Sequence, residues 1–535
     1  MTDASPSYDR IHRYISAGWD RLLRSMNDCA TFEDAKTRGK PVAYLPAELP
    51  FPSDWRRLQQ RCGIRVERLP ARITALGQAD LARIPGPGLL YLPNPYVVPG
   101  GQFNEMYGWD SYFIILGLLR DNRRDVARGM VDNFLFEIEH YGGVLNANRT
   151  YYLTRSQPPF LTSMILAVHE ADQAAGQSDS AWLRKAYGFA ARDYEQWVRP
   201  PHLAGDTGLS RFFDLGAGPV PEIKTDPSHY YREAVNYFLV HGGANGDELV
   251  AVDQDHPSRP VIGPLFDVFV CDPGTGWQPG GDCEVEDKVA LTADFYKGDR
   301  SMRESGFDVT FRFGPFGAHT HHYAAVDLNC LLYKTEIDLQ RISLLLGNEA
   351  DVEKWRERAA ERKKRINQRL WNKDRGLYFD YDFLKHEQSG YEFATTFYPL
   401  WAGLASEEQA RALAQRLGDF EHPGGLVISR NDSGAQWDYP YGWAPVELLA
   451  CEGLRRYGYQ ADAGRVAYHF LTMVLQNFER DKTIREKYNV VTRSSEVKIE
   501  EGYTQNVVGF GWTNGVFLEL ERELPPDLLA KLKAD

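Results

Sequence analysis

Two acidic residues far apart in the chain lie in segments suited to acid–base chemistry. Asp308 lies in RESGFDVTFRF, between Gly306 and Phe311. Apolar neighbours can raise the pKa of a carboxyl group toward the value that a general acid needs. Glu486 and Glu501 lie in the later segment REKYNVVTRSSEVKIEEGYTQNVVGFGWTNG. Carboxyl groups on separate loops are candidates for a general acid and a general base.

Three further segments carry aromatic and polar side chains that suit a sugar ligand. A tryptophan followed by an aspartate occurs twice, as Trp109-Asp110 and as Trp437-Asp438. The indole can stack on a sugar ring, and the carboxylate can bind its hydroxyls. The other candidate ligand contacts in these segments are Gln102, Phe103, Tyr107, Asn146, Arg155, Ser156 and Gln157.

A purely structural explanation exists for each of these residues. An aspartate just before a helix is most often an N-cap, and a single tryptophan is more often part of a core than a ligand platform. Five such segments lie on long loops between helices, however. Long loops in a compact domain usually carry function, so the clustering favours a binding site.

The elements that must position these loops are helices. Apolar residues recur at helical spacing in residues 109–120, 126–141, 161–175, 323–347 and 465–478. Few stretches alternate as strands do. Long segments rich in Gly, Pro, Asp and aromatic residues separate the helices at 94–108, 204–228, 253–285, 301–322, 422–445 and 480–511. The pattern predicts helix pairs packed in a ring, with the loops gathered at one mouth.

The predicted organisation is one large catalytic domain. We expect residues 1–40 to form a peripheral N-terminal helical arm and residues 41–535 to form the catalytic domain, with 41–98 extended around the ring. No repeat of short fixed period is evident, so a closed toroid is favoured over a solenoid.

Composition excludes several classes of partner. The net charge of −13 argues against nucleic acid, because such binding needs clustered Lys and Arg. The first residues lack the pattern of a signal peptide, and no apolar run reaches about 18 residues, so we expect a cytoplasmic protein without a membrane partner.

Neither the cysteines nor the histidines indicate a metal. The six cysteines show no CxxC spacing, and we expect them to be reduced thiols. His319, His321 and His322 have no carboxylate or cysteine at a recognisable ligand spacing. No phosphate-binding loop is present either, so we expect neither a metal nor a cofactor.

At the level of motifs the chain resembles the trehalases, glycoside hydrolase family 37. PGGQFNEMYGWDSYF and QWDYPYGWAP resemble the two signature segments of that family, and NANRTYYLTRSQPPF, RESGFD, EKYN and GFGWTNG resemble its other shared blocks, in the same order over about residues 41–520. In detail the chain is most similar to the neutral cytosolic branch of fungi. It shows neither the regulatory amino-terminal extension nor the calcium-binding loop of that branch.

The resemblance implies an all-α, (α/α)6 toroid and hydrolysis of α,α-trehalose to two glucose molecules with inversion. It assigns Asp308 as the general acid and Glu486 as the general base. Inversion requires the two carboxyl groups to lie roughly 6.5–9.5 Å apart. The resemblance also implies a set of sugar-binding residues. They are Trp109, Asp110, Asn146, Arg155, Ser156, Gln157, Glu222, Gly306 and Glu501.

Two positions depart from the family pattern. The arginine of the family's PGGRF segment is Gln102 here, and the arginine that many members carry before Pro-Glu is Val220. The second departure is shared with the neutral branch. The first replaces a cation by a neutral amide, which keeps hydrogen bonding but loses its charge-assisted strength.

Two alternatives to trehalose hydrolysis stay open. One is a hydrolase of another small α-glucoside, with Gln102 and Val220 reshaping the pocket. The other is a catalytically weak sugar-binding protein on the same fold, against which the presence of both Asp308 and Glu486 argues. A disaccharide is the expected partner, and the protein is expected to be a monomer or a homodimer.

Overall fold

The computed structural model describes residues 6–36, 39–52, 55–222, 227–241, 249–252, 266–270, 284–500 and 505–534. Helices dominate this part of the chain. They are α1 Ser7–Leu22, α2 Trp55–Cys62, α3 Asp110–Arg120, α4 Arg124–His140, α5 Leu161–Ala174, α6 Ser180–Trp197, α7 Pro227–Val240, α8 Ala293–Glu304, α9 Val326–Leu345, α10 Glu349–Arg369, α11 Tyr398–Trp401, α12 Glu407–Arg416, α13 Ala444–Arg456, α14 Gln460–Asp481, α15 Gly511–Arg522 and α16 Pro526–Ala534.

Six helices form a closed inner ring. Helix α3 packs against α5, α5 against α9, α9 against α11, α11 against α13, α13 against α15, and α15 returns to α3. At the point of closure Gly515 lies so close to α3 that a Cβ there would lie 2.0 Å from the carbonyl oxygen of Phe113. The expected (α/α)6 toroid is confirmed.

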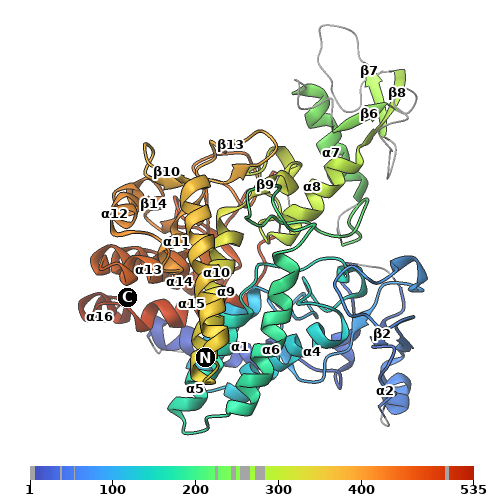
Figure 1. Cartoon of the computed structure of the whole chain (residues 1–535), viewed down its shortest axis with the longest axis horizontal. Helices are drawn as coiled ribbons and strands as arrows, with labels where there is room; N and C mark the ends of the chain where they lie inside the picture. The colour runs from blue at the N-terminus through green and yellow to red at the C-terminus, as the bar shows by residue number, and fades with distance from the viewer. Residues whose placement is uncertain are drawn as a thin grey trace.

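An outer layer of helices covers this ring. Helices α4, α6, α10 and α14 pack against the inner helices, and Figure 1 shows the long helices α9 and α10 lying alongside each other. The two layers differ in how many faces of each helix carry buried residues. The inner α9 buries residues on all its faces, whereas the outer α10 buries only Trp355, Ala359, Arg362 and Ile366, at the spacing of a single helical stripe.

The N-terminal helix is part of this outer layer. Helix α1 packs against α14, α15 and α16 and buries Ile11, Ile15 and Trp19 in the main core. The Trp19 indole donates a hydrogen bond to Asp121 over 2.7 Å and contacts Gly117 of α3.

The strands are short and belong to the segments between helices. They are β1 Leu23–Arg24, β2 Val42–Leu45, β3 Arg65–Arg68, β4 Leu89–Leu90, β5 Tyr96–Val97, β6 Val250–Val252, β7 Phe266–Val270, β8 Glu284–Leu291, β9 Tyr323–Ala324, β10 Trp371–Asn372, β11 Leu377–Tyr378, β12 Tyr381–Asp382, β13 Glu387–Gln388, β14 Glu421–His422, β15 Gly425–Leu426, β16 Tyr441–Trp443 and β17 Lys487–Asn489.

Two of the small sheets correct the expectations for their segments. Residues 41–98 contain the parallel sheet β3-β2-β4, not only extended chain. The segment 253–285, predicted as a loop, contributes β7 and the start of β8 to an antiparallel sheet with β6. With α7, this sheet projects from the ring at the upper right of Figure 1.

The cysteine prediction is wrong at two positions. Cys29 and Cys62 form a disulfide that joins the segment after α1 to the end of α2. Sequence spacing gave no sign of it, because the two cysteines are 33 positions apart and come together only in the folded chain. Cys330 and Cys451 are buried free thiols, as expected, and Cys271 and Cys283 lie outside the described residues.

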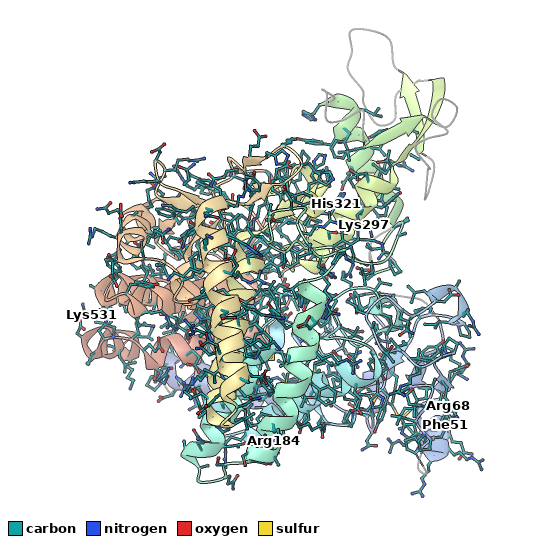
Figure 2. All side chains as sticks on the ribbon, in the orientation of Figure 1. Phe51, Arg68, Arg184, Lys297, His321 and Lys531 are labelled. Atoms are coloured by element: carbon teal, nitrogen blue, oxygen red, sulfur yellow. A yellow bond between two sulfur atoms is a disulfide. The ribbon has the colours of Figure 1, made fainter. Side chains whose placement is uncertain are left out.

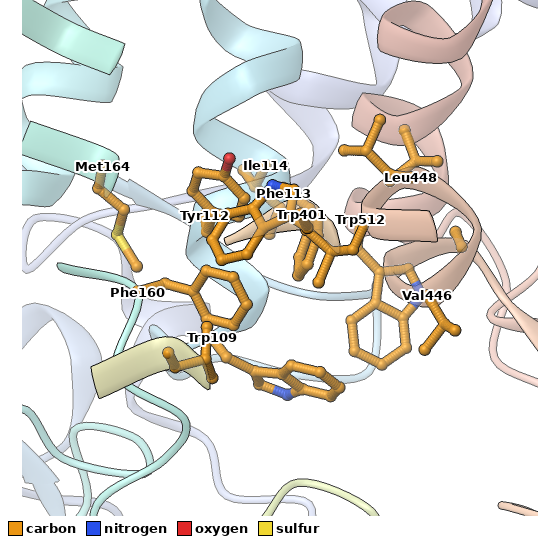
Figure 3. Close-up of a cluster of buried hydrophobic side chains, with 14 of the residues drawn as sticks. Trp109, Tyr112, Phe113, Ile114, Phe160, Met164, Trp401, Val446, Leu448 and Trp512 are labelled. Carbon is orange, nitrogen blue, oxygen red and sulfur yellow. The ribbon is translucent and has the colours of Figure 1, made fainter. Parts of the chain in front are cut away.

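The main core extends up to the mouth of the ring. Figure 3 shows part of it, where Trp109 and Trp512 lie near Phe160, Tyr112 and Trp401. The ring of Tyr112 stacks on Phe160 with centroids 4.9 Å apart. Among the described residues, every helix is too short or too polar to cross the hydrocarbon layer of a membrane.

Candidate active site

A cavity of about 460 Å³ is bounded by the loops at the mouth of the ring. This volume is within the usual range for small-molecule sites. Its walls come from segments spread over the whole chain. They are formed by Lys36, Pro99, Gln102, Phe103, Tyr107, Trp109, Asp110, Asn146, Tyr152, Arg155, Gln157, Glu222, Tyr230, Glu233, Arg303, Gly306, Asp308, Val309, Gln436, Trp437, Trp443, Glu486, Glu500, Gln505, Val507, Phe510 and Trp512.

The start of α3 fixes two of these residues. Trp109 occupies the N-cap position and Asp110 the first turn. The backbone N–H of Trp109 donates to Oε1 of Gln157 over 3.0 Å, so an otherwise unpaired helix N-terminal donor is satisfied by a side chain of the neighbouring loop. Loops 94–108 and 146–157 are therefore held together at the cavity wall.

Asp308 lies just after α8, with its side chain 24% exposed. Burial raises its pKa to about 6, although the guanidinium groups of Arg303 and Arg155 act in the opposite direction. Arg303 Nη1 lies 3.6 Å from the Asp308 carboxylate. A carboxyl group with this pKa is protonated in about half of the molecules near pH 6 and in about a tenth near pH 7. An ordinary aspartate is protonated in only about a thousandth of the molecules near pH 7, and a general acid must be protonated to act.

Glu486 lies beside a fully buried cation. Its Oε2 accepts a hydrogen bond from Nζ of Lys487 over 3.0 Å, and Lys487 is 0% exposed. Nζ also donates to Oε1 of Gln436 over 2.8 Å. This hydrogen bond fixes the orientation of the Glu486 carboxylate, the kind of group that a general base supplies.

Gln436 connects the two carboxyl-bearing segments. Its Nε2 donates to the backbone carbonyl of Asp308 while its Oε1 accepts from Lys487, which in turn donates to Glu486. The pairing of β16 with β17 supports this link, since Trp443 is the partner of Lys487. The positions of Asp308 and Glu486 are thus fixed relative to each other by one buried amide and one buried ammonium.

Two further acidic residues of the cavity have pKa values that are shifted in opposite directions. Burial raises the pKa of Asp110 well above its usual value, and the nearby carboxylates of Glu486 and Asp308 raise it further. Burial also opposes ionisation of Glu222, but Arg155 and Arg303 outweigh this effect and lower its pKa. Arg155 forms an ion pair with Glu222, so this pair provides both a donor and an acceptor for hydroxyl groups.

An aromatic cluster forms one wall. The indoles of Trp437 and Trp443 stack with centroids 3.6 Å apart, and Trp109 and Trp512 meet edge-to-face at 5.5 Å. Gly306 has φ +77°, and a Cβ on it would lie 3.0 Å from the Trp109 indole. A glycine is thus needed where the chain turns toward Asp308.

All but three of the residues predicted from sequence line this cavity. Ser156 is buried and donates from Oγ to the carbonyl of Val144 over 2.6 Å. Asp438 accepts from Tyr391 Oη and Ser433 Oγ over 2.8 and 2.6 Å, so its carboxylate supports the neighbouring loop instead of forming the cavity wall. Glu501 lies outside the described residues.

Sequence reasoning missed several cavity residues. Gln436 directly precedes Trp437, and Arg303 lies three positions before Gly306 in the segment RESGFD. Both could have been found by treating each segment as a whole. Trp443 and Trp512 likewise lie in the segments YGWAP and GFGWTNG. Lys36 lies in the segment assigned to the N-terminal arm, and only the structure shows it at the cavity.

The two departures from the family pattern lie in different surroundings. Gln102 lines the cavity. Val220 is 2% exposed in an apolar cluster with Tyr231 and Phe295, and its backbone N–H donates to Tyr231 Oη over 2.9 Å. Val220 itself is therefore not part of the described cavity wall.

The histidine cluster, His319, His321 and His322, packs against α8, and Figure 2 labels His321. A carboxylate that sequence spacing did not reveal lies beside the cluster. Asp294 Oδ1 is 2.9 Å from His321 Nε2 and 3.8 Å from His322 Nε2. These groups are close enough to hold an ion. The His321–Asp294 hydrogen bond explains the cluster without one.

Comparison with known proteins agrees with this geometry. The trehalase family model matches residues 12–248 and 287–524. A probable trehalase of Saccharomyces cerevisiae is 36% identical over 95% of this chain and 68% of its own length, and a cytosolic neutral trehalase of the same yeast is 35% identical over 95% and 71%. The solved structure of the neutral trehalase Nth1 of that yeast superposes with a TM-score of 0.77 at 32% identity, covering 99% of this chain and 96% of the yeast chain. The chain therefore belongs to the trehalase family.

Proposed function

We propose that the protein hydrolyses α,α-trehalose to two glucose molecules with inversion at the reacting anomeric carbon. Asp308 is the general acid and Glu486 the general base. The observation that carries this proposal is the placement of both carboxyl groups on one cavity, with the pKa of Asp308 raised by burial and Glu486 hydrogen-bonded to the Lys487 ammonium.

The acid step follows from the environment of Asp308. Its raised pKa increases the fraction of molecules in which the carboxyl group carries a proton, and this proton is delivered to the glycosidic oxygen as the bond to the anomeric carbon breaks. Arg303 lies 3.6 Å away and stabilises the carboxylate that remains. Its charge also prevents the pKa from rising so far that proton transfer becomes unfavourable.

The base step follows from the environment of Glu486. The ionised carboxylate, held by Lys487, accepts a proton from water as the water attacks the anomeric carbon on the face opposite the leaving group. The oxygen of the water becomes the anomeric hydroxyl of the first glucose, and the proton from Asp308 completes the hydroxyl of the second. Each cycle transfers one proton to Glu486 and removes one from Asp308, and exchange with solvent restores both.

The remaining walls suit two glucose rings. Indole faces and edges from Trp109, Trp437 and Trp512 supply apolar surface, while the Arg155–Glu222 pair supplies donors and acceptors for hydroxyl groups. Acid–base hydrolysis of this type uses two carboxyl groups and water and requires no cofactor.

Replacement of each carboxyl group tests the assignment. Asp308→Ala and Glu486→Ala are each expected to lower kcat by about 10²–10⁴-fold with an unchanged circular dichroism spectrum. Glucose release is the assay, and Ser156→Ala, which alters a buried residue away from the cavity wall, is a control for local packing. Either alanine variant with wild-type kcat would remove its residue from the mechanism.

A substrate panel tests the alternative of another small α-glucoside. The observation that favours this alternative is Gln102 on the cavity wall, where the family carries arginine. Trehalose as the substrate with the highest kcat/KM supports the first proposal. A higher value for maltose or another α-glucoside would favour the second.

We further propose a cytoplasmic location, supported by the names of the yeast and Emericella nidulans relatives, which are cytosolic neutral trehalases. We also propose that residues 41–535 form one catalytic domain and that residues 1–40 associate with it. The assembly state, monomer or homodimer, is open to measurement by light scattering.

A further inference from the structure

Lys36 reaches the active-site cavity from the N-terminal segment. It lines the same wall as Gln102, Phe103, Tyr107 and Tyr152. Its Nζ donates to the hydroxyl of Tyr107 and, over 2.9 Å, to the hydroxyl of Tyr152. The sequence offered no sign of this, because residues 1–40 carry none of the family segments.

The ammonium lies among three aromatic rings. Nζ is 5.7 Å from the ring centroid of Phe103, 5.0 Å from that of Tyr107 and 5.3 Å from that of Tyr152. These distances are within the range of cation–π attraction. Phe103 directly follows Gln102 in the chain, and both line the cavity together with Lys36, so a cation lies in the same cavity as the position at which the family arginine is missing.

The segment that carries Lys36 is firmly attached to the cavity loops. The carbonyl of Glu33 accepts hydrogen bonds from Asn104 Nδ2 over 3.0 Å and from Arg149 Nη2 over 2.6 Å. Asp34 accepts from Tyr151 Oη over 3.2 Å. The partners of this segment are thus the loops before α3 and before α5, which also form the cavity wall.

Two covalent or local constraints complete this attachment. The disulfide Cys29–Cys62 fixes the start of the segment to the end of α2. The backbone N–H of Lys36 donates to Asp34 Oδ1 over 2.8 Å, which closes a tight turn immediately before Lys36 reaches the cavity. The position of the ammonium is therefore set by the folded segment and not by a freely rotating arm.

We propose that Lys36 is a substrate-binding residue, which supplies from the N-terminal segment the cationic hydrogen-bond donor that Gln102 no longer supplies. Its ligand is a hydroxyl group of a glucosyl unit in the cavity. The ammonium has three N–H donors, and a charge-assisted bond to a hydroxyl is roughly twice as strong as a neutral one. The inference rests on the proposed hydrolysis of trehalose and deepens it.

A double-mutant cycle between positions 36 and 102 tests this assignment. Lys36→Met removes the charge and keeps the length of the side chain. It is expected to raise KM for trehalose about 10- to 100-fold, the range typical of a lost hydrogen bond to a charged group, with a smaller change in kcat. Gln102→Arg is expected to recover about tenfold in kcat/KM in the Lys36→Met background and to change the wild type little.

Two controls separate binding from folding. Lys40→Met removes an exposed lysine of the same segment and is expected to leave KM unchanged. Trehalose binding, followed by tryptophan fluorescence in the inactive Asp308→Asn background, is expected to weaken on Lys36→Met by the same factor as KM rises. A variant that had merely lost stability would show a lower melting temperature with unchanged affinity.

The outcomes distinguish this inference from the proposed function. Failure of the wild type to release glucose from trehalose would refute the proposed function. An active wild type together with a Lys36→Met variant whose KM lies within twofold of it would refute only the role of Lys36. An equal effect of Gln102→Arg in both backgrounds would show that the two positions do not substitute for each other.

Discussion

Replacement of Arg303 by methionine removes the cation nearest to the proposed general acid. Arg303 Nη1 lies 3.6 Å from the carboxylate of Asp308, whose pKa is about 6. At that distance a unit-charge interaction is worth about 1 kcal/mol in water and about 4–5 kcal/mol at an effective dielectric constant of 20. Because the Asp308 side chain is 24% exposed, we take the lower half of this range.

The predicted shift follows from the sign of the interaction. The guanidinium favours the ionised carboxylate, so its removal raises the pKa of Asp308. With about 1.4 kcal/mol for each pKa unit, the rise is about 1–2 units. The acid must be protonated to act, so the alkaline decline in kcat/KM is expected to move from near pH 6 in the wild type to about pH 7–8 in the variant.

The assay is the pH dependence of kcat/KM for trehalose, since this quantity reports the free enzyme. The absolute rate of Arg303→Met is expected to be lower, because Arg303 also lines the cavity. The test therefore depends on the pH at which kcat/KM declines and not on its absolute value. Arg303→Lys, which keeps the charge, is the matched control and should retain the wild-type profile. A decline that stays in place or moves to lower pH in Arg303→Met would refute the assignment of Asp308 as the acid.

Three further predictions concern other parts of the site. Lys487→Met leaves the carboxylate of Glu486 without its buried partner. We therefore expect the free energy of unfolding, measured by urea titration, to fall by roughly 3–5 kcal/mol, and kcat to fall at least about tenfold. A variant with normal stability and normal kcat would contradict this. Gly306→Ala places a side chain at φ +77°, and a loss of about 1–2 kcal/mol is expected by the same titration, which an unchanged midpoint would refute. Reduction of Cys29–Cys62, which closes a loop of sequence separation 33, is expected to cost roughly 3–4 kcal/mol. The melting temperature should fall with reductant in the wild type and stay constant in a variant with serine at both positions; equal melting curves with and without reductant in the wild type would contradict this.

The helices of the ring were predictable because a helix with a buried face carries apolar residues at a period of about 3.6 positions. The apolar pattern at 161–175 corresponds to α5, Leu161–Ala174, and that at 109–120 to α3, Asp110–Arg120. Helices α3 and α5 pack against inner-ring neighbours on both sides, so their apolar positions persist over several turns. Most strands have only two or three residues and were missed because so short a segment carries no recognisable alternation. The longer strands β2, β3, β7 and β8 were missed as well.

The site was predictable as far as its residues lie inside continuous segments. Trp109 and Asp110 were found together because the N-terminus of one helix carries both. Gln436 was missed because its importance rests on contacts with Asp308 and Lys487, which are distant in the chain. Lys36 and the Cys29–Cys62 disulfide were missed for the same reason, since a pairing across the fold leaves no periodic signal in the sequence.

The most direct test of catalysis by Asp308 and Glu486 is proton NMR of the purified protein with trehalose, following the anomeric signals during the first minutes. Inverting hydrolysis by two carboxyl groups predicts β-glucose and α-glucose in equal early amounts, because one glucose carries the inverted centre and the other leaves with its α configuration intact. Early release of α-glucose alone would contradict inversion. The absence of any glucose would contradict the assignment of trehalose as substrate.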